Sequence, residues 1–227
     1  MQLVDLGPGV VAGFTNAGLD LSVPGGPPAL AVRLGYPVVL AQQVHGVALK
    51  WVDQLPVDLV HDAGRGDALA TRLGGVVLVI KTADCVPVLL ADPTTGLVAA
   101  VHAGWRGVIR QIVPRVVQRL GQLGAANLRA AIGPAICAQC YPVSPSLAGQ
   151  FATVGLPVGL TEDGEPSLDL VAGVRAQLQG IGVSQIEDVG QCTKCSPGYF
   201  SHRRQGRAAG RQCAWIRHVK AAGAERP

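Results

Sequence analysis

The sequence is poor in aromatic side chains and in charge. Phe, Trp and Tyr together make up 4% of its 227 residues and charged residues 15%, whereas hydrophobic residues reach 48%. Disordered chains combine low hydrophobicity with high net charge, so this composition excludes bulk disorder and predicts a substantial core. The net charge of +4 is too mild to indicate a nucleic-acid partner by itself.

The sequence also lacks a long apolar run. No stretch approaches the roughly 20 residues that cross a bilayer, and the opening MQLVDLGPGV has neither the basic start nor the apolar core of a signal peptide. We therefore expect a cytoplasmic protein without a membrane partner. In that compartment the six cysteines are expected to be reduced thiols or metal ligands rather than disulfides.

Apolar, mostly β-branched runs predict the strands. They cover residues 76–80, 86–90, 97–101, 130–136 and 213–219. The turn signal DPTTG predicts that the second and third of these form a hairpin. Pro87 predicts that the second begins at a sheet edge or a bulge, because proline cannot donate to the ladder.

Two segments have a helical apolar period. One begins near Val108 and runs to about Leu120, with Pro114 expected to kink it or shorten its start. The other follows Asp169, a candidate N-cap. The Gly/Pro cluster at 24–28 is interpreted as a surface loop. Together these patterns predict an α+β fold, with a mixed-sheet, sandwich-like core flanked by helices in one domain over residues 1–227.

Three potential metal ligands follow apolar segments. His45 lies in QQVHG, Cys85 follows the strand at 76–80, and His102 follows the strand at 97–101. Two imidazoles and a thiolate suit Zn²⁺ or copper, and three protein ligands leave the vacant position of a catalytic site. On the residues alone, two hydrogen-bonded turn histidines and a small buried cysteine remain the alternative.

A second set of thiols forms two CxxC pairs, Cys137 with Cys140 and Cys192 with Cys195. Four thiolates can close around a structural zinc. Residues 141–191 separate the pairs, however, which far exceeds the roughly 15–20 residues between pairs in compact four-cysteine modules. We therefore interpret these cysteines as half-buried reduced thiols, with zinc as the alternative.

Arginines supply candidate anion contacts, because guanidinium groups match phosphate oxygens. Four lie within FSHRRQGRAAGR and one within HAGWRG: Arg203, Arg204, Arg207, Arg211 and Arg106. The alternative is a solvated basic loop, which we favour for Arg207. Tyr199 and Phe200 stand beside the cluster, so a nucleic-acid or partner-binding module stays a minor alternative.

Three segments taken together resemble a known family. QQVHG, TADCVPVLLAD and VHAGWRG, followed by IGPAICAQCY and CTKCSPGYFSHRRQGRAAGRQ, are similar to the multicopper-polyphenol-oxidase-like (laccase-domain, DUF152) family, whose members are also described as bacterial purine nucleoside phosphorylases. The resemblance covers roughly residues 43–215. It implies a mixed sandwich-like sheet core covered by helices and a metal site on His45, Cys85 and His102, usually taken as zinc and in an older interpretation as copper.

The resemblance also implies phosphorolysis of adenosine and inosine, cleavage of methylthioadenosine and deamination of adenosine. Nucleoside and phosphate are then the partners, and the protein is expected as a monomer or weak homo-oligomer. The chain departs from the family pattern at several places, where it carries Asn16, Pro142, His202 and Gln205.

These observations give one leading hypothesis, a zinc-dependent purine nucleoside phosphorylase with adenosine deaminase activity. Its catalytic residues are Cys85, His102 and Asp84, with Asp67 as another carboxylate that could orient a ligand or relay a proton. Its phosphate contacts are Arg203, then Arg204 and Arg106. The alternatives are a copper-dependent polyphenol oxidase and a metal-free hydrolase of cell-wall precursors with Cys85 as nucleophile.

Overall fold

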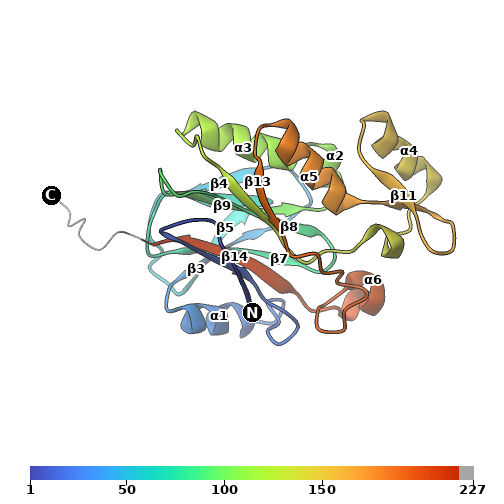
Figure 1. The fold of residues 1–227 in the computed structure, drawn as a ribbon. Helices are drawn as coiled ribbons and strands as arrows, with labels where there is room; N and C mark the ends of the chain where they lie inside the picture. Colours follow the sequence, from blue (N-terminus) through green and yellow to red (C-terminus); the bar gives the residue numbers. More distant parts are fainter. Residues whose placement is uncertain (220–227) are drawn as a thin grey trace.

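The computed structural model describes residues 1–219, and in it two six-stranded sheets face each other with helices on their outer sides (Figure 1). The first sheet has the order β1 (Gln2–Val4), β2 (Val10–Phe14), β14 (Gln212–His218), β7 (Val77–Thr82), β3 (Val38–Gln42) and β5 (Val60–Arg65). The second has the order β13 (Gln185–Asp188), β10 (Arg129–Ile132), β8 (Val86–Asp92), β9 (Leu97–Ala103), β6 (Ala68–Thr71) and β4 (Leu49–Val52). Both sheets mix parallel and antiparallel pairs.

The helices lie on the outer faces and beside the sandwich. Their bounds are α1 (Gly26–Leu34), α2 (Trp105–Ile109), α3 (Ile112–Gln122), α4 (Pro145–Thr153), α5 (Leu170–Gly180) and α6 (His202–Gln205). Helix α1 covers the first sheet, and α2, α3 and α5 cover the second. Helix α4 and the small hairpin of β11 (Val158–Leu160) and β12 (Pro166–Leu168) project at one end (Figure 1).

Side-chain alternation along the strands builds three apolar layers. On β8, Val88 and Leu90 face the helices, whereas Leu89 and Ala91 lie between the two sheets. A third layer, which includes Trp215, packs the first sheet against α1. Strand β8 is apolar on both faces because both are covered, which explains its unbroken run of hydrophobic residues. The predicted α+β sandwich flanked by helices is confirmed.

The predicted hairpin is the pair β8 and β9, with register from Val86 opposite Ala103 to Asp92 opposite Leu97. The edge position predicted from Pro87 is wrong, because β8 lies between β9 and β10. The chain accommodates proline there since β10 ends opposite it. The carbonyl of Pro87 accepts a hydrogen bond at 2.9 Å from the N–H of Gly133, just past the last residue of β10.

Two other boundaries differ from the sequence prediction. The helix expected from Val108 is split into α2 and α3, because Gln111 adopts a left-handed backbone with φ of 60°. Pro114 then falls in the first turn of α3, where proline is tolerated. The loop expected at 24–28 already contains the start of α1, whose first turn includes Pro27.

Asp169 caps α5 as predicted, and its carboxylate accepts a hydrogen bond from the Ala172 N–H at 2.9 Å. Among residues 1–219, no helix combines the length and the apolar character that a membrane crossing requires.

Candidate metal centre

The structure brings His45, Cys85 and His102 together. Their ligand atoms all lie within 4.8 Å of one another. His45 lies in the turn after β3, Cys85 lies between β7 and β8, and His102 is the penultimate residue of β9. Strands β3 and β7 are parallel neighbours, so the segments that follow them leave the first sheet at the same end of these strands. In the second sheet, the start of β8 and the end of β9 lie side by side.

One carboxylate organises both histidines. Asp67 is fully buried and accepts hydrogen bonds from the backbone N–H groups of Val44, His45 and Gly46 at 3.2, 2.9 and 2.7 Å. The same carboxylate contacts Nδ1 of His102 at 2.8 Å. Burial acts to raise the pKa of Asp67, but the hydrogen bond from His102 and those from the backbone outweigh it and lower the pKa.

This contact fixes which nitrogen of His102 is available. Because Nδ1 binds Asp67, Nε2 is left to face a metal, which is the carboxylate–histidine–metal arrangement that tunes many metal sites. Sγ of Cys85 and Nε2 of His45 lie 3.8 Å apart. Bonds of about 2.3 Å from zinc to sulfur and about 2.0 Å to nitrogen, at tetrahedral angles, place such atoms about 3.5 Å apart. The three ligands therefore fit Zn²⁺.

Gly104 is required beside this group. A Cβ at that position would lie 2.9 Å from Cδ2 of His45 and 3.1 Å from Sγ of Cys85. Any side chain there would push two of the three ligands apart. The glycine of HAGWRG thus lets the chain turn into α2 directly against the metal ligands.

Without a metal, Cys85 and His102 form a charged pair. Burial acts to raise the pKa of Cys85, but the neighbouring charge and hydrogen bond of His102 outweigh it and lower the pKa to about 6. Burial acts to lower the pKa of His102, but the Cys85 charge and the Asp67 hydrogen bond raise it to about 9. A thiolate beside an imidazolium therefore predominates between these values, and the thiolate is the form that binds metal.

Two strained backbone positions also lie here. Within residues 1–219, the non-glycine residues with positive φ are His45 (57°), Asp84 (89°) and Gln111 (60°). His45 is one of the three candidate ligands, and Asp84 directly precedes Cys85, which is another. Such conformations persist only where the surroundings enforce them. Asp67 enforces the turn at His45, and the contacts of Asp84 enforce its own turn.

Asp84 supports the second side of the site rather than the ligands themselves. Its carboxylate accepts a hydrogen bond from the Thr193 hydroxyl at 2.6 Å and another from the Arg203 N–H at 2.7 Å. The side chain is 6% exposed. One oxygen thus contacts the loop at Thr193 and the other contacts α6, so Asp84 links the residue beside Cys85 to Arg203.

Arg203 is the arginine that this link positions. Its guanidinium lies over the ring of Tyr141, 4.6 Å from the centroid, and donates to the Pro142 carbonyl at 2.9 Å. Tyr141 in turn lies near Cys85. Burial raises the pKa of the Tyr141 phenol to about 12, with the Cys85 charge adding to the shift and Arg203 opposing it. Tyr141 therefore lies close to both Arg203 and Cys85.

Arg204 is engaged elsewhere. Its guanidinium donates to the carbonyls of Thr193, Lys194 and Ser196 at 2.8, 2.6 and 3.3 Å, and to that of Tyr199. These contacts fasten the 193–199 loop and occupy the donors that a phosphate would need. Arg106 stacks on Trp105 at 4.5 Å from the ring centroid and is exposed. Within residues 1–219 its guanidinium makes no hydrogen bond.

Sequence reasoning did not place Tyr141 or Thr193 in the site. Both directly adjoin cysteines of the CxxC pairs, and that adjacency was the available signal. Of the two carboxylates that the sequence offers as supports, Asp67 is the one that contacts His102. No sequence period pointed to it, because the contact depends on the antiparallel pairing of β6 with β9.

The two CxxC pairs also meet, although residues 141–191 separate them in the sequence. Three of the four thiols are half-buried, as predicted, whereas Cys195 is exposed. Their gathering was not expected, and its cause is that β10 and β13 are parallel neighbours. The chain continues from the end of each strand into one CxxC pair, so the two pairs lie at the same end of the second sheet.

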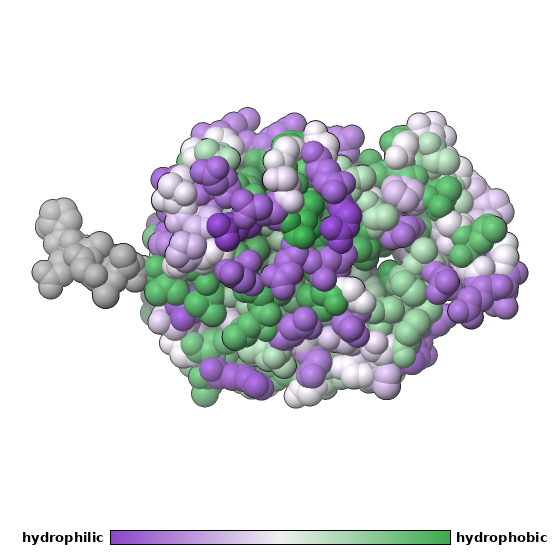
Figure 2. Space-filling model, in the orientation of Figure 1, coloured by the Kyte–Doolittle hydropathy of each residue, from purple (hydrophilic) through white to green (hydrophobic). Residues whose placement is uncertain are grey.

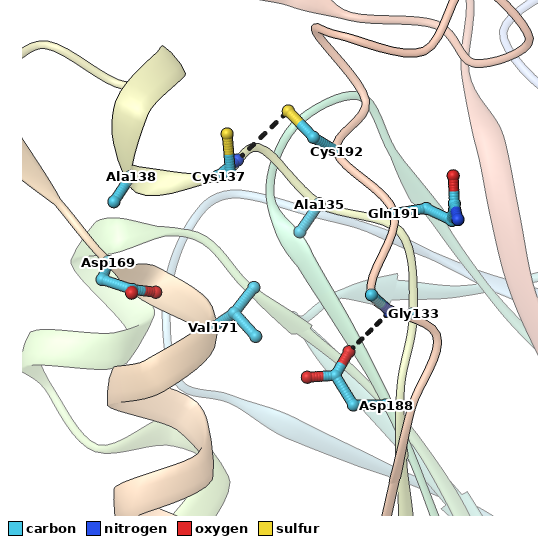
Figure 3. A pocket seen from close by; sticks show the side chains of 10 residues that line it. Gly133, Ala135, Cys137, Ala138, Asp169, Val171, Asp188, Gln191 and Cys192 are labelled. Carbon is cyan, nitrogen blue, oxygen red and sulfur yellow. Dashed lines mark hydrogen bonds between the residues drawn. The ribbon is translucent and has the colours of Figure 1, made fainter. Parts of the chain in front are cut away.

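A cavity of about 190 Å³ adjoins the thiols (Figure 3). Its lining includes Cys137, Cys192, Asp169 and Asp188. Asp169 caps α5 and Asp188 pairs with Arg175 at 2.5 Å, so both carboxylates have partners. His45, Cys85 and His102 are not among the residues that line this cavity, so their group is separate from it. In Figure 2 a hollow separates the sandwich from the projection that carries α4 and β11.

Comparison with known proteins identifies relatives of the whole sandwich. The family model for multi-copper polyphenol oxidoreductase laccase matches residues 28–218. The crystal structure of YlmD from Geobacillus stearothermophilus aligns with a TM-score of 0.81 and 30% identity over 94% of this chain and 93% of that chain. The Bacillus licheniformis protein YfiH aligns with a TM-score of 0.80 and 28% identity over 93% of both chains.

Curated relatives carry enzyme names. A purine nucleoside phosphorylase of Streptomyces coelicolor is 41% identical over 183 residues, covering 79% of this chain and 74% of the relative. One of Deinococcus radiodurans is 39% identical over 197 residues, covering 82% and 74%. A protein named adenosine deaminase RL5, from an unknown prokaryotic organism, is 36% identical over 200 residues, covering 80% and 76%.

Proposed function

Because the chain belongs to the multi-copper polyphenol oxidoreductase laccase family, we propose that it is a zinc-dependent purine nucleoside phosphorylase that also deaminates adenosine. Adenosine, inosine and methylthioadenosine are the proposed nucleosides, and phosphate is the second substrate. The observation that carries the proposal is the three-ligand group of His45, Cys85 and His102, joined through Tyr141 to Arg203. The names of the relatives at about 40% identity support it.

Zinc is the proposed metal because two imidazoles and one thiolate match its donor preferences, and three protein ligands leave one position for a reactant. When bound, Zn²⁺ supplies Lewis acidity toward an oxygen or nitrogen substituent of the substrate. Asp67 holds His102 with Nε2 free and keeps the His45 turn in place. The metal ligands are thus oriented before substrate arrives.

Arg203 is the proposed phosphate contact. Its backbone is fixed by Asp84 and its guanidinium is stacked on Tyr141, so little side-chain freedom remains to be lost on binding. Holding phosphate beside the nucleoside converts a bimolecular encounter into an oriented one. Arg106 is the second proposed contact, and Arg204 is left out because its donors fasten the 193–199 loop.

Tyr141 is proposed as a hydrogen-bond donor to the substrate. With its pKa raised to about 12, the phenol stays protonated at neutral pH and can donate to a phosphate or purine acceptor. Its position between Cys85 and Arg203 lets it contact a substrate that bridges the metal ligands and the phosphate contact.

Copper oxidase chemistry is less well supported by the donor set. The group of three ligands encloses a single ion. The other histidines that the structure describes lie on different elements, His61 on β5, His202 on α6 and His218 on β14. A multicopper cluster needs more histidine ligands than this group contains.

A second candidate function rests on the charged pair of Cys85 and His102. A thiolate with a pKa near 6 beside an imidazolium is the arrangement of a nucleophilic cysteine. In a metal-free protein this pair would act as a hydrolase, with cell-wall precursors as the alternative substrates. Metal content separates the two functions, because a zinc-bound Cys85 is not a free nucleophile.

The test is base release from inosine and adenosine, with and without phosphate, in zinc-loaded protein. We expect release that depends on both phosphate and zinc, with inosine also formed from adenosine. Arg203→Ala should raise the KM for phosphate, and Arg207→Ala is the matched control because Arg207 is an exposed residue of the same segment. Release that is independent of phosphate, or equally fast after zinc removal, would contradict the proposal.

A further inference from the structure

The two CxxC pairs continue a parallel strand pairing. Beyond β10 and β13, the Ala135 N–H donates to the Gln191 carbonyl at 3.1 Å, and the Thr193 N–H donates to the Ala135 carbonyl at 3.0 Å. A bridge pairs Ala135 with Cys192. The loops therefore run side by side up to the first cysteine of each pair.

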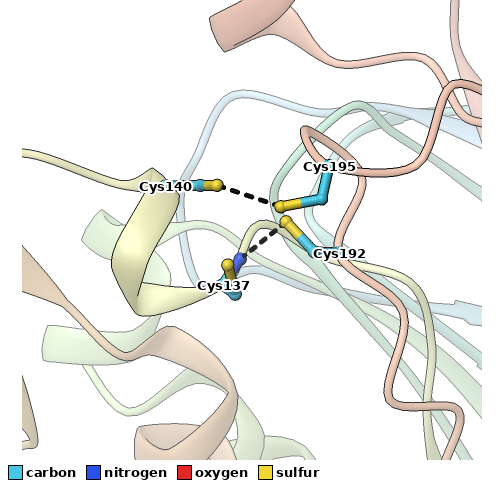
Figure 4. A group of neighbouring side chains, drawn as sticks. All are labelled: Cys137, Cys140, Cys192 and Cys195. Carbon is cyan, nitrogen blue, oxygen red and sulfur yellow. Dashed lines mark hydrogen bonds between the residues drawn. The ribbon is translucent and has the colours of Figure 1, made fainter. Parts of the chain in front are cut away.

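Each pair then turns so that its second cysteine rejoins the first. The short helical turn Ala138–Cys140 brings Cys140 back over Cys137, with a hydrogen bond from the Cys140 N–H to the Cys137 carbonyl at 3.1 Å. In the other loop the Ser196 N–H donates to the Cys192 carbonyl at 3.0 Å. Both pairs thus point their sulfur atoms toward one point (Figure 4).

The four sulfur atoms enclose the space of one ion. All lie within 4.8 Å of one another, and Sγ of Cys140 and Cys195 are 3.2 Å apart. Four zinc–sulfur bonds of about 2.3 Å at tetrahedral angles place sulfurs about 3.8 Å apart. The Cys137 N–H donates to Sγ of Cys192 at 3.4 Å, a contact that favours sulfur in its anionic form.

We propose that Cys137, Cys140, Cys192 and Cys195 bind one Zn²⁺ in a closed structural site, distinct from the His45, Cys85 and His102 group. Four thiolates in a tetrahedral set select zinc among the common divalent metals. Four protein ligands leave no position for a reactant, so the site is structural. Four thiolates and one Zn²⁺ leave a charge of −2, and the Arg204 guanidinium on the Thr193 and Lys194 carbonyls lies where it offsets that charge.

The ion would hold together the two cysteine-bearing loops, which also carry Tyr141 and Thr193 beside the candidate active site. Tyr141 directly follows Cys140 and stacks under Arg203. Thr193 directly follows Cys192 and donates to Asp84. Zinc at the four thiols therefore sets the positions of Tyr141 and Arg203 without touching substrate. The metal-binding part of this inference does not depend on the proposed function.

The experiment measures bound zinc per chain in the full-length protein after loading with Zn²⁺ and removal of excess. Four proteins are compared: the wild type, the double variant His45→Ala with His102→Ala, the double variant Cys140→Ser with Cys195→Ser, and Cys213→Ser. Cys213 is a buried cysteine on β14, with the Thr15 hydroxyl as its partner. It serves as the control for loss of a thiol. Cobalt replaces zinc in a parallel set, because its absorption reports the number of thiolate ligands.

We expect the histidine variant to keep one equivalent of metal, with the strong sulfur-to-cobalt absorption of four thiolates. The Cys140→Ser and Cys195→Ser variant should lose that equivalent and that absorption, while Cys213→Ser keeps both. If the serine variant does not fold, the histidine variant still decides the matter, since its retained ion can lie only outside the first group.

Two results would overturn the inference. One is a histidine variant that folds and retains no metal. The other is a native protein in which peptide mass analysis finds Cys140 joined to Cys195 as a disulfide. Because neither result depends on nucleoside turnover, failure of this inference is distinguishable from failure of the proposed function.

Discussion

Two sulfur-containing groups lie at the same end of this protein, and they are built differently. His45, Cys85 and His102 are held by strand ends and by Asp67 between the two sheets. The four thiols lie on loops beyond β10 and β13, where side-by-side backbone contacts hold them. The first group offers three ligand atoms, whereas the second offers four. The comparison shows that candidate metal ligands can be positioned either by strand ends around a buried carboxylate or by paired loops that extend from parallel strands.

The largest expected effect concerns the open group. His102→Ala removes a ligand and leaves Asp67 buried without its partner, so phosphorolysis should fall about a thousandfold, since metal stabilisation of developing charge contributes several kcal/mol. Steady-state kcat/KM on inosine measures it. His61→Ala, an exposed histidine on β5, should leave the rate near that of the wild type. Equal loss in both variants would refute a special role for His102.

Thiol reactivity should distinguish Cys85 from Cys137 when metal is removed. Cys85 has a pKa of about 6 because of His102, whereas burial and the neighbouring Cys192 thiol raise that of Cys137 to about 11. At pH 7 Cys85 is mostly thiolate and Cys137 mostly thiol. We expect Cys85 to be alkylated about a hundredfold faster, after allowing for the lower nucleophilicity of a low-pKa thiolate.

The pH profiles should differ in the same way. Alkylation of Cys85 should be constant above about pH 7 and should fall as the pH drops through 6, while alkylation of Cys137 should keep rising toward pH 11. Peptide mass analysis after timed treatment with iodoacetamide measures both. Alkylation of Cys137 at the rate of Cys85 at pH 7 would show that the proposed difference in charge state is wrong.

Asp67→Asn tests the support beneath the open group. The amide cannot accept from His102 and from three backbone N–H groups as a carboxylate does, so zinc affinity at this group should fall about 10- to 100-fold. Competition with a zinc chelator measures it in the Cys140→Ser, Cys195→Ser background. The control is Asp62→Asn, an exposed carboxylate on β5, for which we expect no change.

The smallest expected effect tests whether the two groups communicate. Thr193→Val removes the hydroxyl that donates to Asp84 while keeping the side-chain shape. Leaving one buried carboxylate oxygen unpaired costs about 1–3 kcal/mol, which should lower stability and raise the KM for phosphate a few-fold through Arg203. Both metal equivalents should remain. A full loss of activity with normal stability would indicate a direct catalytic role for Thr193 instead.

Much of the layered fold could be predicted from the sequence, because β7, β8 and β9 are continuous apolar runs with a clear turn between the last two. The first metal group was also within reach, since its members follow such strands. Strand β13, QIED, alternates polar and apolar residues over only four positions and was not recognised. Without β13, the sequence gives no reason for Cys192 to lie beside Cys137, so the four-cysteine zinc site stays the less favoured alternative at the level of sequence.

The contacts of Arg204 and Asp84 could not be predicted for a related reason. An arginine that binds phosphate and one that binds backbone carbonyls have the same sequence context in FSHRRQGR. Only the path of the 193–199 loop decides between them, and that path depends on long-range pairing. Local sequence patterns therefore indicate where reactive residue types lie. The partner of each hydrogen-bond donor depends instead on tertiary contacts.

The single carboxylate beneath the two histidines has a consequence for acid stability. Asp67 lies under the turn of His45 and against the ring of His102. Protonating it would weaken the support of both histidines at once, because the same carboxylate contacts the His45 turn and the His102 ring. Because the pKa of Asp67 is already lowered, we expect this loss of support only in strongly acidic solution, below the range in which the Cys85 thiolate itself is protonated.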